Sequence, residues 1–174
     1  MDPRAGESDE ASSSTAGVSN PFIVVHEGDL FAKAPQSSVL VHACNTQGSW
    51  GSGIAAAFKA KFPDAYEVYH QVCIEKGSAL LGTSLLIPSG ETDIACLFTS
   101  RGYGKKKDPK RMILDSTRSA VADLQRQLEG SDKPIYGCRI NAGLFRVPWE
   151  ETVGVLQDLN FQMTIYEIAP LQNT

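Results

Sequence analysis

A glycine-rich loop is the first stretch whose residue types could do chemistry. Residues 44–53 (CNTQGSWGSG) follow an apolar run and precede a segment with helical periodicity. Glycine lets backbone N–H groups approach an anion closely, and a helix N-terminus adds about half a positive charge. The spacing GxxGxG is neither a P-loop nor the GxGxxG dinucleotide motif. Residues 44–53 therefore indicate a phosphate site of another kind, and Trp50 could shield the phosphates from water. Alternatively, the glycines only allow the chain to turn.

A second loop has the same features. Residues 141–147 (NAGLFRV) place Asn141 and Gly143 before Pro148, which suits the first turn of a helix. If both loops leave neighbouring strands, they could clamp a diphosphate between them. Phe145 could then close over a sugar, or equally form a surface contact.

His42 is the candidate acid–base residue. An imidazole titrates near neutral pH and suits proton transfer, and His42 lies on the apolar run that leads to Asn45. The alternative is a buried strand histidine that bonds to the backbone. Cys44 shares a strand face with His42, but nothing near it in the sequence marks an activated thiol.

The cysteines indicate no metal or disulfide framework. They stand at positions 44, 73, 96 and 138, and the chain contains no CxxC and no Cys/His ligand spacing. Zinc and a set of disulfides are therefore not expected, no carboxylate cluster suggests another metal, and no cofactor is predicted. This cysteine usage favours a reducing, intracellular compartment, which we expect to be the cytoplasm, the nucleus or both.

The composition divides the chain into parts. Residues 1–20 contain five serines and four acidic residues against Arg4, and such a segment cannot bury enough apolar surface to offset its ordering entropy. We expect a disordered tail over residues 1–20, one domain over 21–170 and a short tail over 171–174. The first tail holds −3 of the chain's −4 net charge, which leaves about −1 elsewhere. A nucleic-acid partner or a membrane span of about 18 apolar residues is not expected, and we expect a monomer.

One segment departs from this near-neutral balance. Residues 101–111 (RGYGKKKDPKR) hold six cationic residues and one acidic residue. Such a segment could steer an anionic substrate or contact RNA or a protein. Alternatively, it is a mobile, solvated loop.

Short apolar runs alternate with segments of helical periodicity. Strands are expected at residues 22–26, 38–43, 83–88, 94–100, 134–140 and 161–168, and helices at 53–62, 64–76, 113–128 and after Pro148. The alternation predicts an α/β fold with a mostly parallel sheet covered on both faces. Ligands bind beyond the carboxyl ends of the strands in such sheets, which is where both loops lie.

The motifs GDLF (28–31), VLVHACN (39–45), GSWGSGIA (48–55), INAGLFRVPW (140–149) and TIYEI (164–168) stand in the order and spacing of a macrodomain. The sequence resembles that family over roughly residues 22–168. It is most similar to the fungal-type ADP-ribose 1''-phosphate phosphatases, in the group that also contains the terminal ADP-ribose protein glycohydrolase. The resemblance implies a three-layer α/β/α fold with a mixed, mostly parallel sheet.

The resemblance also implies roles for individual residues. Asp29 would accept a hydrogen bond from the adenine amino group beside the Leu30 backbone, and Asn45 would hold hydroxyls of the distal ribose. Tyr166 would either approach the adenine or pack within its strand. The first phosphate loop would consist of Gly51, Ser52, Gly53 and Ile54, and the second of Asn141, Ala142, Gly143, Leu144 and Phe145.

The sequence departs from the glycohydrolase at two positions. That enzyme has a nucleophilic lysine after its LIT segment and an assisting aspartate in its GLDR loop, where this chain has Ser100 and Phe145. The lysine mechanism is therefore not expected, and His42 with Asn45 remain as the catalytic candidates.

The resemblance implies hydrolysis of ADP-ribose 1''-phosphate, a nucleotide from tRNA-splicing metabolism, to ADP-ribose and phosphate. Two alternatives stay open: removal of mono-ADP-ribose from acidic side chains of proteins, and a non-catalytic module that reads ADP-ribose. The implied partners are these nucleotides and, for the alternatives, ADP-ribosylated proteins.

Overall fold

The computed structural model describes residues 22–168. The expected tails, residues 1–20 and 171–174, lie outside the described residues. No helix in the described part is both long and apolar enough to cross a membrane.

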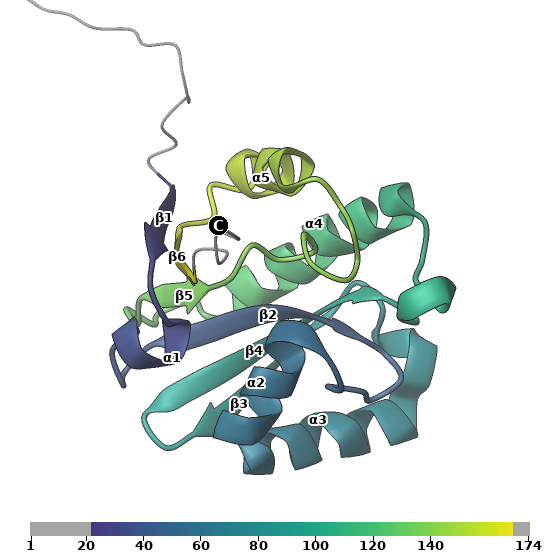
Figure 1. The fold of residues 1–174 in the computed structure, drawn as a ribbon, viewed down its shortest axis with the longest axis horizontal. Helices are drawn as coiled ribbons and strands as arrows, with labels where there is room; N and C mark the ends of the chain where they lie inside the picture. The colour runs from purple at the N-terminus through teal and green to yellow at the C-terminus, as the bar shows by residue number, and fades with distance from the viewer. Residues whose placement is uncertain (1–21, 169–174) are drawn as a thin grey trace, which may run out of the picture.

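A mixed sheet forms the centre of the described chain (Figure 1). Its strands are β1 (Ile23–Glu27), β2 (Val39–Asn45), β3 (Ser84–Ser89), β4 (Thr92–Ser100), β5 (Ile135–Gly137) and β6 (Met163–Glu167). Their spatial order is β1-β6-β5-β2-β4-β3. Neighbouring strands run parallel except β3 and β4, which form an antiparallel hairpin.

Helices cover both faces of the sheet. They are α1 (Leu30–Lys33), α2 (Gly53–Lys61), α3 (Pro63–Lys76), α4 (Lys110–Gln127) and α5 (Trp149–Asp158), with 3₁₀ turns η1 (Gly77–Leu80) and η2 (Gly104–Lys106). Figure 1 shows α4 and α5 on one side of the sheet and α2 and α3 on the other. The predicted three-layer α/β/α architecture is confirmed.

The alternation of side chains along β2 explains why the core has two halves. Val39 and Val41 face the layer of α4 and α5, whereas Leu40 and Cys44 face the layer of α1, α2 and α3. Successive residues of a strand point to opposite faces, so His42 shares the face of Leu40 and Cys44.

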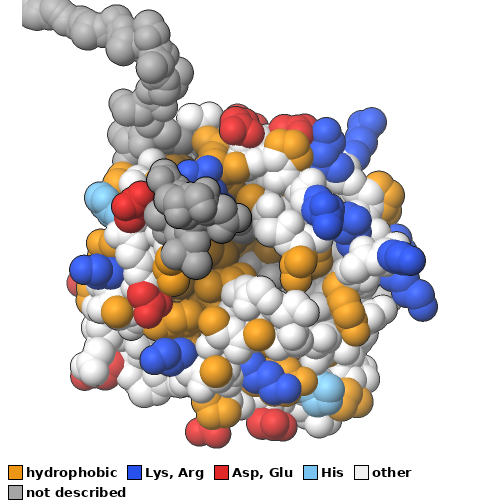
Figure 2. Space-filling view, in the orientation of Figure 1, with side chains coloured by type: hydrophobic (Ala, Val, Ile, Leu, Met, Phe, Trp, Pro, Cys, Tyr) orange, Lys and Arg blue, Asp and Glu red, His pale blue; other side chains and the backbone are white. Residues whose placement is uncertain are grey.

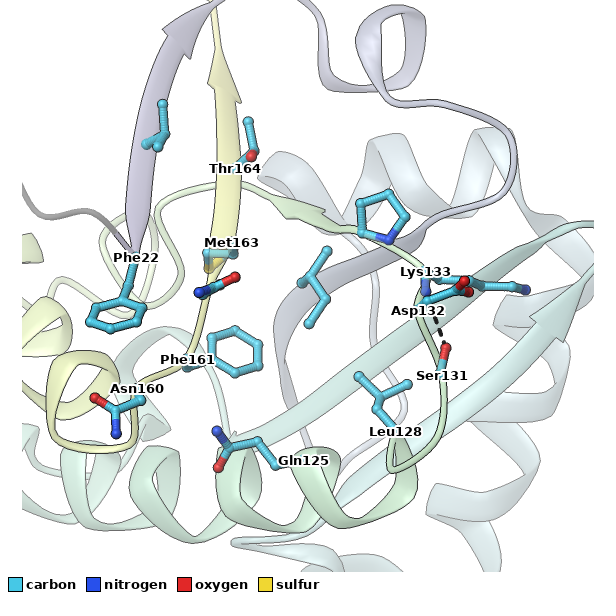
Figure 3. Close-up of a pocket in the computed structure, with 14 residues that line it drawn as sticks. Phe22, Gln125, Leu128, Ser131, Asp132, Lys133, Asn160, Phe161, Met163 and Thr164 are labelled. Atoms are coloured by element: carbon cyan, nitrogen blue, oxygen red, sulfur yellow. Dashed lines mark hydrogen bonds between the residues drawn. The ribbon is translucent and has the colours of Figure 1, made fainter.

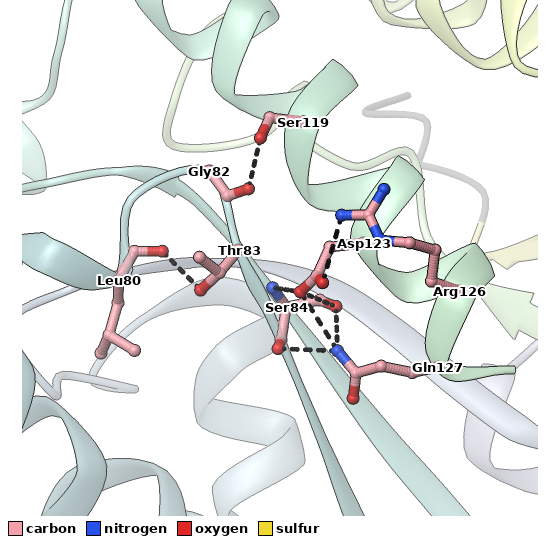
Figure 4. Close-up of polar contacts among 8 residues, drawn as sticks. All are labelled: Leu80, Gly82, Thr83, Ser84, Ser119, Asp123, Arg126 and Gln127. Carbon is pink, nitrogen blue, oxygen red and sulfur yellow. Dashed lines mark hydrogen bonds and ion pairs between the residues drawn. The ribbon is translucent and has the colours of Figure 1, made fainter.

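Helix α4 is fixed to the edge strand β3 by side-chain hydrogen bonds (Figure 4). The Asp123 carboxylate accepts from the Ser84 backbone N–H at 2.9 Å and from the Ser84 hydroxyl at 3.1 Å. The Gln127 amide donates to the Ser84 carbonyl at 3.0 Å. Burial alone would raise the pKa of Asp123, but the bonds from Ser84 lower it below its usual value. These bonds hold the outer strand against the helix layer.

Two features differ from the expected elements. Helix α1 and the 3₁₀ turns are too short to give a periodic apolar pattern, and only the capping aspartate before α1 marks its start. The expected strand at 134–140 pairs only over Ile135–Gly137. Beyond Gly137 the chain leaves the ladder and turns into the second glycine loop.

Candidate functional site

The two glycine-rich loops meet at the carboxyl edge of the sheet. The first follows β2 and the second follows β5, and these strands are neighbours. A Cβ on Gly53 would lie 3.5 Å from Leu144 Cδ1, so the loops are in contact across the edge. The φ of Gly53 is +62°, a conformation that L side chains rarely adopt. The expected placement of both loops on neighbouring strands is confirmed.

The first loop leaves a helix N-terminus open to a ligand. Ser52 is the N-cap of α2, and its side chain makes no capping hydrogen bond. Gly51, Ser52 and Gly53 are exposed, and Ile54 is 38% exposed. The N–H groups at the start of a helix have no partner within it, so this turn offers donors and a positive dipole end to an anion.

Asn45 organises the first loop from within. Its carboxamide nitrogen donates to the Ser49 carbonyl at 2.9 Å, and its oxygen accepts from the Gln47 N–H at 2.9 Å and the Tyr69 hydroxyl at 3.1 Å. Asn45 is 6% exposed. These bonds give the Asn45 side chain a structural role in the loop, and its expected roles at the distal ribose and in catalysis stay predictions.

Asn141 plays the corresponding part in the second loop. It adopts a left-handed φ of 67°, its side-chain oxygen accepts from the Thr99 hydroxyl at 2.9 Å, and its nitrogen donates to Thr117 Oγ1 at 2.9 Å. The Val147 N–H donates to its carbonyl at 2.9 Å. The buried Asn141 side chain thus ties the loop to β4 and α4, and ligand contact from this residue is left to its backbone.

The remainder of the second loop is more accessible. Gly143 and Leu144 are exposed, and Ala142 and Phe145 are half-buried. A Cβ on Gly143 would meet no atom within 4 Å. The exposed residues lie beside the first loop, where a bound diphosphate would contact both.

His42 lies in the core and not at the site. Its side chain is fully buried, its ring stacks on Phe58 at a centroid distance of 4.0 Å, and Trp50 meets it edge-on at 4.7 Å. Burial lowers the pKa of His42 from 6.5 to about 3, so the imidazole is neutral at physiological pH. This corrects the catalytic interpretation of His42, because the ring is both uncharged and enclosed.

The sulfur of Cys44 completes this buried cluster. It lies 3.6 Å from both Nδ1 and Nε2 of His42, and the ligand atoms of His42, Cys44 and Cys96 lie within 4.8 Å of one another. The sulfur is therefore equidistant from the two nitrogens and in line with the lone pair of neither one. Burial raises the pKa of the Cys44 thiol well above its usual value.

Trp50 anchors the first loop from below. It is 1% exposed, stacks on Tyr69 at 4.8 Å and meets Tyr66 edge-on at 5.5 Å. This corrects the expectation that Trp50 covers the phosphates. The glycines allow the loop to bend over this large buried ring, and Gly48 is tied to α3 by its carbonyl, which accepts from the Tyr66 hydroxyl at 3.1 Å.

Asp29 marks the other end of the carboxyl edge, after β1. Its carboxylate accepts from the Phe31 N–H at 3.1 Å as the cap of α1, and its second oxygen makes no hydrogen bond within residues 22–168. Leu30 is buried behind it. Tyr166 adjoins this corner, since a Cβ on Gly28 would lie 3.3 Å from its ring. The corner has one free carboxylate oxygen beside an aromatic ring, which suits a nucleobase.

Sequence reasoning missed a network at the end of β4. The buried carboxylate of Asp108 accepts from the Arg101 N–H at 2.8 Å and from Arg101 Nε at 3.0 Å. The buried Ser100 hydroxyl donates to the Gly102 carbonyl at 2.8 Å and accepts from the Asp108 N–H at 2.9 Å. The one acidic residue among six cationic ones was the available signal. Hydrogen bonds therefore join the two ends of the segment, while Lys105 and Lys106 between them are exposed.

A separate cavity of about 500 Å³ lies at the opposite, amino-terminal edge of the sheet (Figure 3). Leu128, Phe161 and Met163 form apolar parts of its wall, and Asp132 and Asn160 form polar parts. It shares no lining residue with either glycine loop.

Comparisons with known proteins agree with this architecture. A family model described as Macro domain matches residues 41–156. Two curated relatives bear the name ADP-ribose 1''-phosphate phosphatase. The protein from Neosartorya fischeri is 40% identical over 182 residues, which cover 80% of this chain and 90% of the relative. The protein from Debaryomyces hansenii is 43% identical over 164 residues, which cover 77% and 92%.

A solved structure has the same fold. Thermosipho africanus DarTG in complex with ADP-ribose matches with a TM-score of 0.67 at 20% identity, over 89% of this chain and 43% of that chain. The sequence match to the family model spans both glycine loops and most of the sheet. The chain belongs to the Macro domain family.

Proposed function

We propose that this chain binds ADP-ribose derivatives and hydrolyses ADP-ribose 1''-phosphate to ADP-ribose and phosphate. The observation that carries the proposal is the identity of 40–43% with phosphatases of that name over at least nine-tenths of their length. The open N-terminus of α2 beside the second loop supports a ligand with a central diphosphate.

The binding mode follows the carboxyl edge. Asp29 takes the adenine through its free carboxylate oxygen, and the exposed amides of Gly51, Ser52 and Gly53 take the diphosphate from one side. The second loop closes on it from the other side through Gly143 and Leu144. The half-buried ring of Phe145 then lies against the distal ribose, with the terminal phosphate beyond it.

The chemistry rests on positioning and on fixed dipoles. A water oxygen bonds to phosphorus, the bond from phosphorus to the anomeric oxygen breaks, and that oxygen takes up a proton to give ADP-ribose. His42 is buried and neutral, so it takes no part in the proton transfer. Preorganised backbone donors stabilise the charge that develops on the phosphoryl oxygens, an effect that can be worth several kcal/mol.

A non-catalytic reader of ADP-ribose is the second candidate. It is favoured by one observation: the side chains of His42 and Asn45, the catalytic candidates, are both occupied within the fold. Removal of ADP-ribose from protein side chains by the lysine mechanism finds less support. Ser100 stands at the position of the nucleophilic lysine, and its buried hydroxyl is bonded to the Gly102 carbonyl.

Phosphate release from ADP-ribose 1''-phosphate separates the two candidates. We expect turnover by the purified protein and its loss in Gly53→Ala, whose Cβ strains the backbone at φ +62° in the first loop. The matched control is Gly90→Ala, at φ +64° in the β3–β4 turn with nothing within 4 Å of its Cβ. Both substitutions cost about 1–2 kcal/mol of backbone strain, so only the first should change turnover.

A purified wild type that releases no phosphate yet binds ADP-ribose would be the reader. Equal turnover in Gly53→Ala and the wild type would show that the first loop is not the phosphate site.

A further inference from the structure

We infer that the basic segment, residues 101–111, recognises the terminal phosphate of the substrate. The inference rests on the proposed function and deepens it, because it assigns the part of the site that distinguishes ADP-ribose 1''-phosphate from ADP-ribose. Four observations carry it: the order of features along the edge, the hydrogen bonds that close the segment, its unpaired charge, and its bonds to the first loop and to helix α5.

Along the carboxyl edge, the adenine corner and the basic segment lie on opposite sides, with both phosphate loops between them. Asp29 follows β1, the second loop follows β5, the first loop follows β2, and the basic segment follows β4, in a sheet ordered β1-β6-β5-β2-β4-β3. From one end to the other, the ligand consists of adenosine, a diphosphate, the distal ribose and the terminal phosphate. From β1 to β4 there are four interstrand steps, or about 19 Å, a span that suits the extended nucleotide. The basic segment stands where the terminal phosphate must lie.

Hydrogen bonds and a close backbone approach restrain the segment. Asp108 and Ser100 bond the two ends of its turn together, as described above. A Cβ on Gly102 would lie 2.6 Å from the Lys106 carbonyl oxygen, so the turn closes more tightly than any other residue at position 102 would permit. A fixed turn presents its cations without the entropy cost of ordering a loop on binding.

Its charge is largely unneutralised. Arg101 pairs with Asp108 at 3.0 Å and Lys110 with Glu151 at 3.1 Å. Lys105, Lys106, Lys107 and Arg111 form no ion pair within residues 22–168. Lys and Arg side chains gather at the right of Figure 2, on the side where Figure 1 places η2 and the start of α4. Holding like charges together is unfavourable unless an anion binds there.

The segment is bonded to the first phosphate loop and to helix α5, which follows the second loop. The Thr46 hydroxyl donates to the Arg101 carbonyl at 2.9 Å, which ties it to the first loop. Lys110 pairs with Glu151 in the first turn of α5, directly after the second loop. These bonds attach the basic segment to the elements that carry the two phosphate loops. The chain as a whole has a net charge of −4, whereas a nucleic-acid-binding domain is usually basic overall.

The test compares two double variants with equal charge change. K105Q/K106Q removes two exposed cations of η2, and K59Q/K61Q removes two from the last turn of α2, at the far end of that helix from the site. We measure KM for ADP-ribose 1''-phosphate and the inhibition constant of ADP-ribose, at low and high salt. In K105Q/K106Q, KM should rise about five- to tenfold at low salt and less at high salt. The inhibition constant of ADP-ribose should stay within about twofold, and K59Q/K61Q should change neither.

Two outcomes would overturn the inference. Either KM is unchanged in K105Q/K106Q, or KM and the inhibition constant rise together, which would mean general attraction of nucleotides. Tight, salt-dependent binding of an RNA oligonucleotide that is lost only in K105Q/K106Q, with KM unchanged, would assign the segment to nucleic acid. If the wild type does not turn over, the proposed function fails on its own, and displacement of labelled ADP-ribose by ADP-ribose 1''-phosphate tests the same selectivity at equilibrium.

Discussion

Replacing His42 by phenylalanine should remove a pH dependence of stability and leave turnover intact. The pKa of His42 falls from 6.5 to about 3 in the folded chain because its ring is enclosed between Phe58, Trp50 and Cys44. The unfolded chain binds a proton below pH 6.5 and the folded chain does not. His42 therefore lowers stability as pH falls from 6.5 towards 3, and its contribution is fully present above 6.5.

The magnitude follows from the size of this shift. Linkage gives about 1.4 kcal/mol per pH unit well below 6.5, or about 2 kcal/mol between pH 7.5 and pH 5.0. Phenylalanine keeps an aromatic ring against Phe58 but does not titrate, so His42→Phe lacks this slope. The larger ring costs about 1–3 kcal/mol of overpacking at every pH, which shifts the curve without tilting it.

Urea unfolding of both proteins at pH 7.5, 6.5, 5.75 and 5.0 measures the difference in slope, and phosphate release at pH 7.5 measures turnover. His42→Leu provides a second, smaller apolar replacement if the phenylalanine variant folds poorly. The explanation from burial would be refuted by either of two results. One is a His42→Phe protein with the wild-type pH slope, and the other is a folded variant whose turnover falls by about 10²-fold or more, as loss of a general acid or base would produce.

Two further predictions concern the site. Asp29→Ala should weaken ADP-ribose binding in calorimetry and lower the free energy of unfolding by about 1 kcal/mol through loss of the α1 cap. Asp29→Asn should keep the cap. Unchanged affinity in Asp29→Ala would show that Asp29 is not part of the adenine site. Hydrolysis in ¹⁸O-labelled water should place the label in the released phosphate, because neither a lysine nor a carboxylate stands at the two catalytic positions of the glycohydrolase. Mass spectrometry of the products detects the label, and label in the ribose would instead mean attack at the anomeric carbon.

The fold could be predicted from the sequence because the patterns that indicate strands and helices are local and recur along the chain. Strands β2 and β4 are largely apolar runs, and helix α4 carries an apolar stripe that covers one face of the sheet. The hairpin was also predictable, since the SGETD turn separates two short β-rich runs. Parallel pairing then follows from the alternation of strands and helices.

Individual side chains of the site were less predictable. Residue type and spacing place His42 and Asn45 next to the ligand, but whether a strand side chain points into a helix layer depends on the partner surfaces. Phe58 and Tyr69, from α2 and α3, take up both side chains. The Ser100–Asp108 network joins residues eight apart through a turn with no periodic pattern, so only the structure could identify it.

The position of Trp50 gives the protein an internal optical reporter. The chain contains two tryptophans. Trp149 is half-buried, with the Arg139 guanidinium 5.9 Å from its ring centroid. Trp50 is enclosed directly beneath the first loop, and its Nε1 atom has no hydrogen-bond partner among residues 22–168. In a Trp149→Phe background the emission spectrum would come from Trp50 alone, and its unbonded indole would emit at short wavelength. Movement of the first loop on ligand binding would then register as a change in fluorescence without any added label.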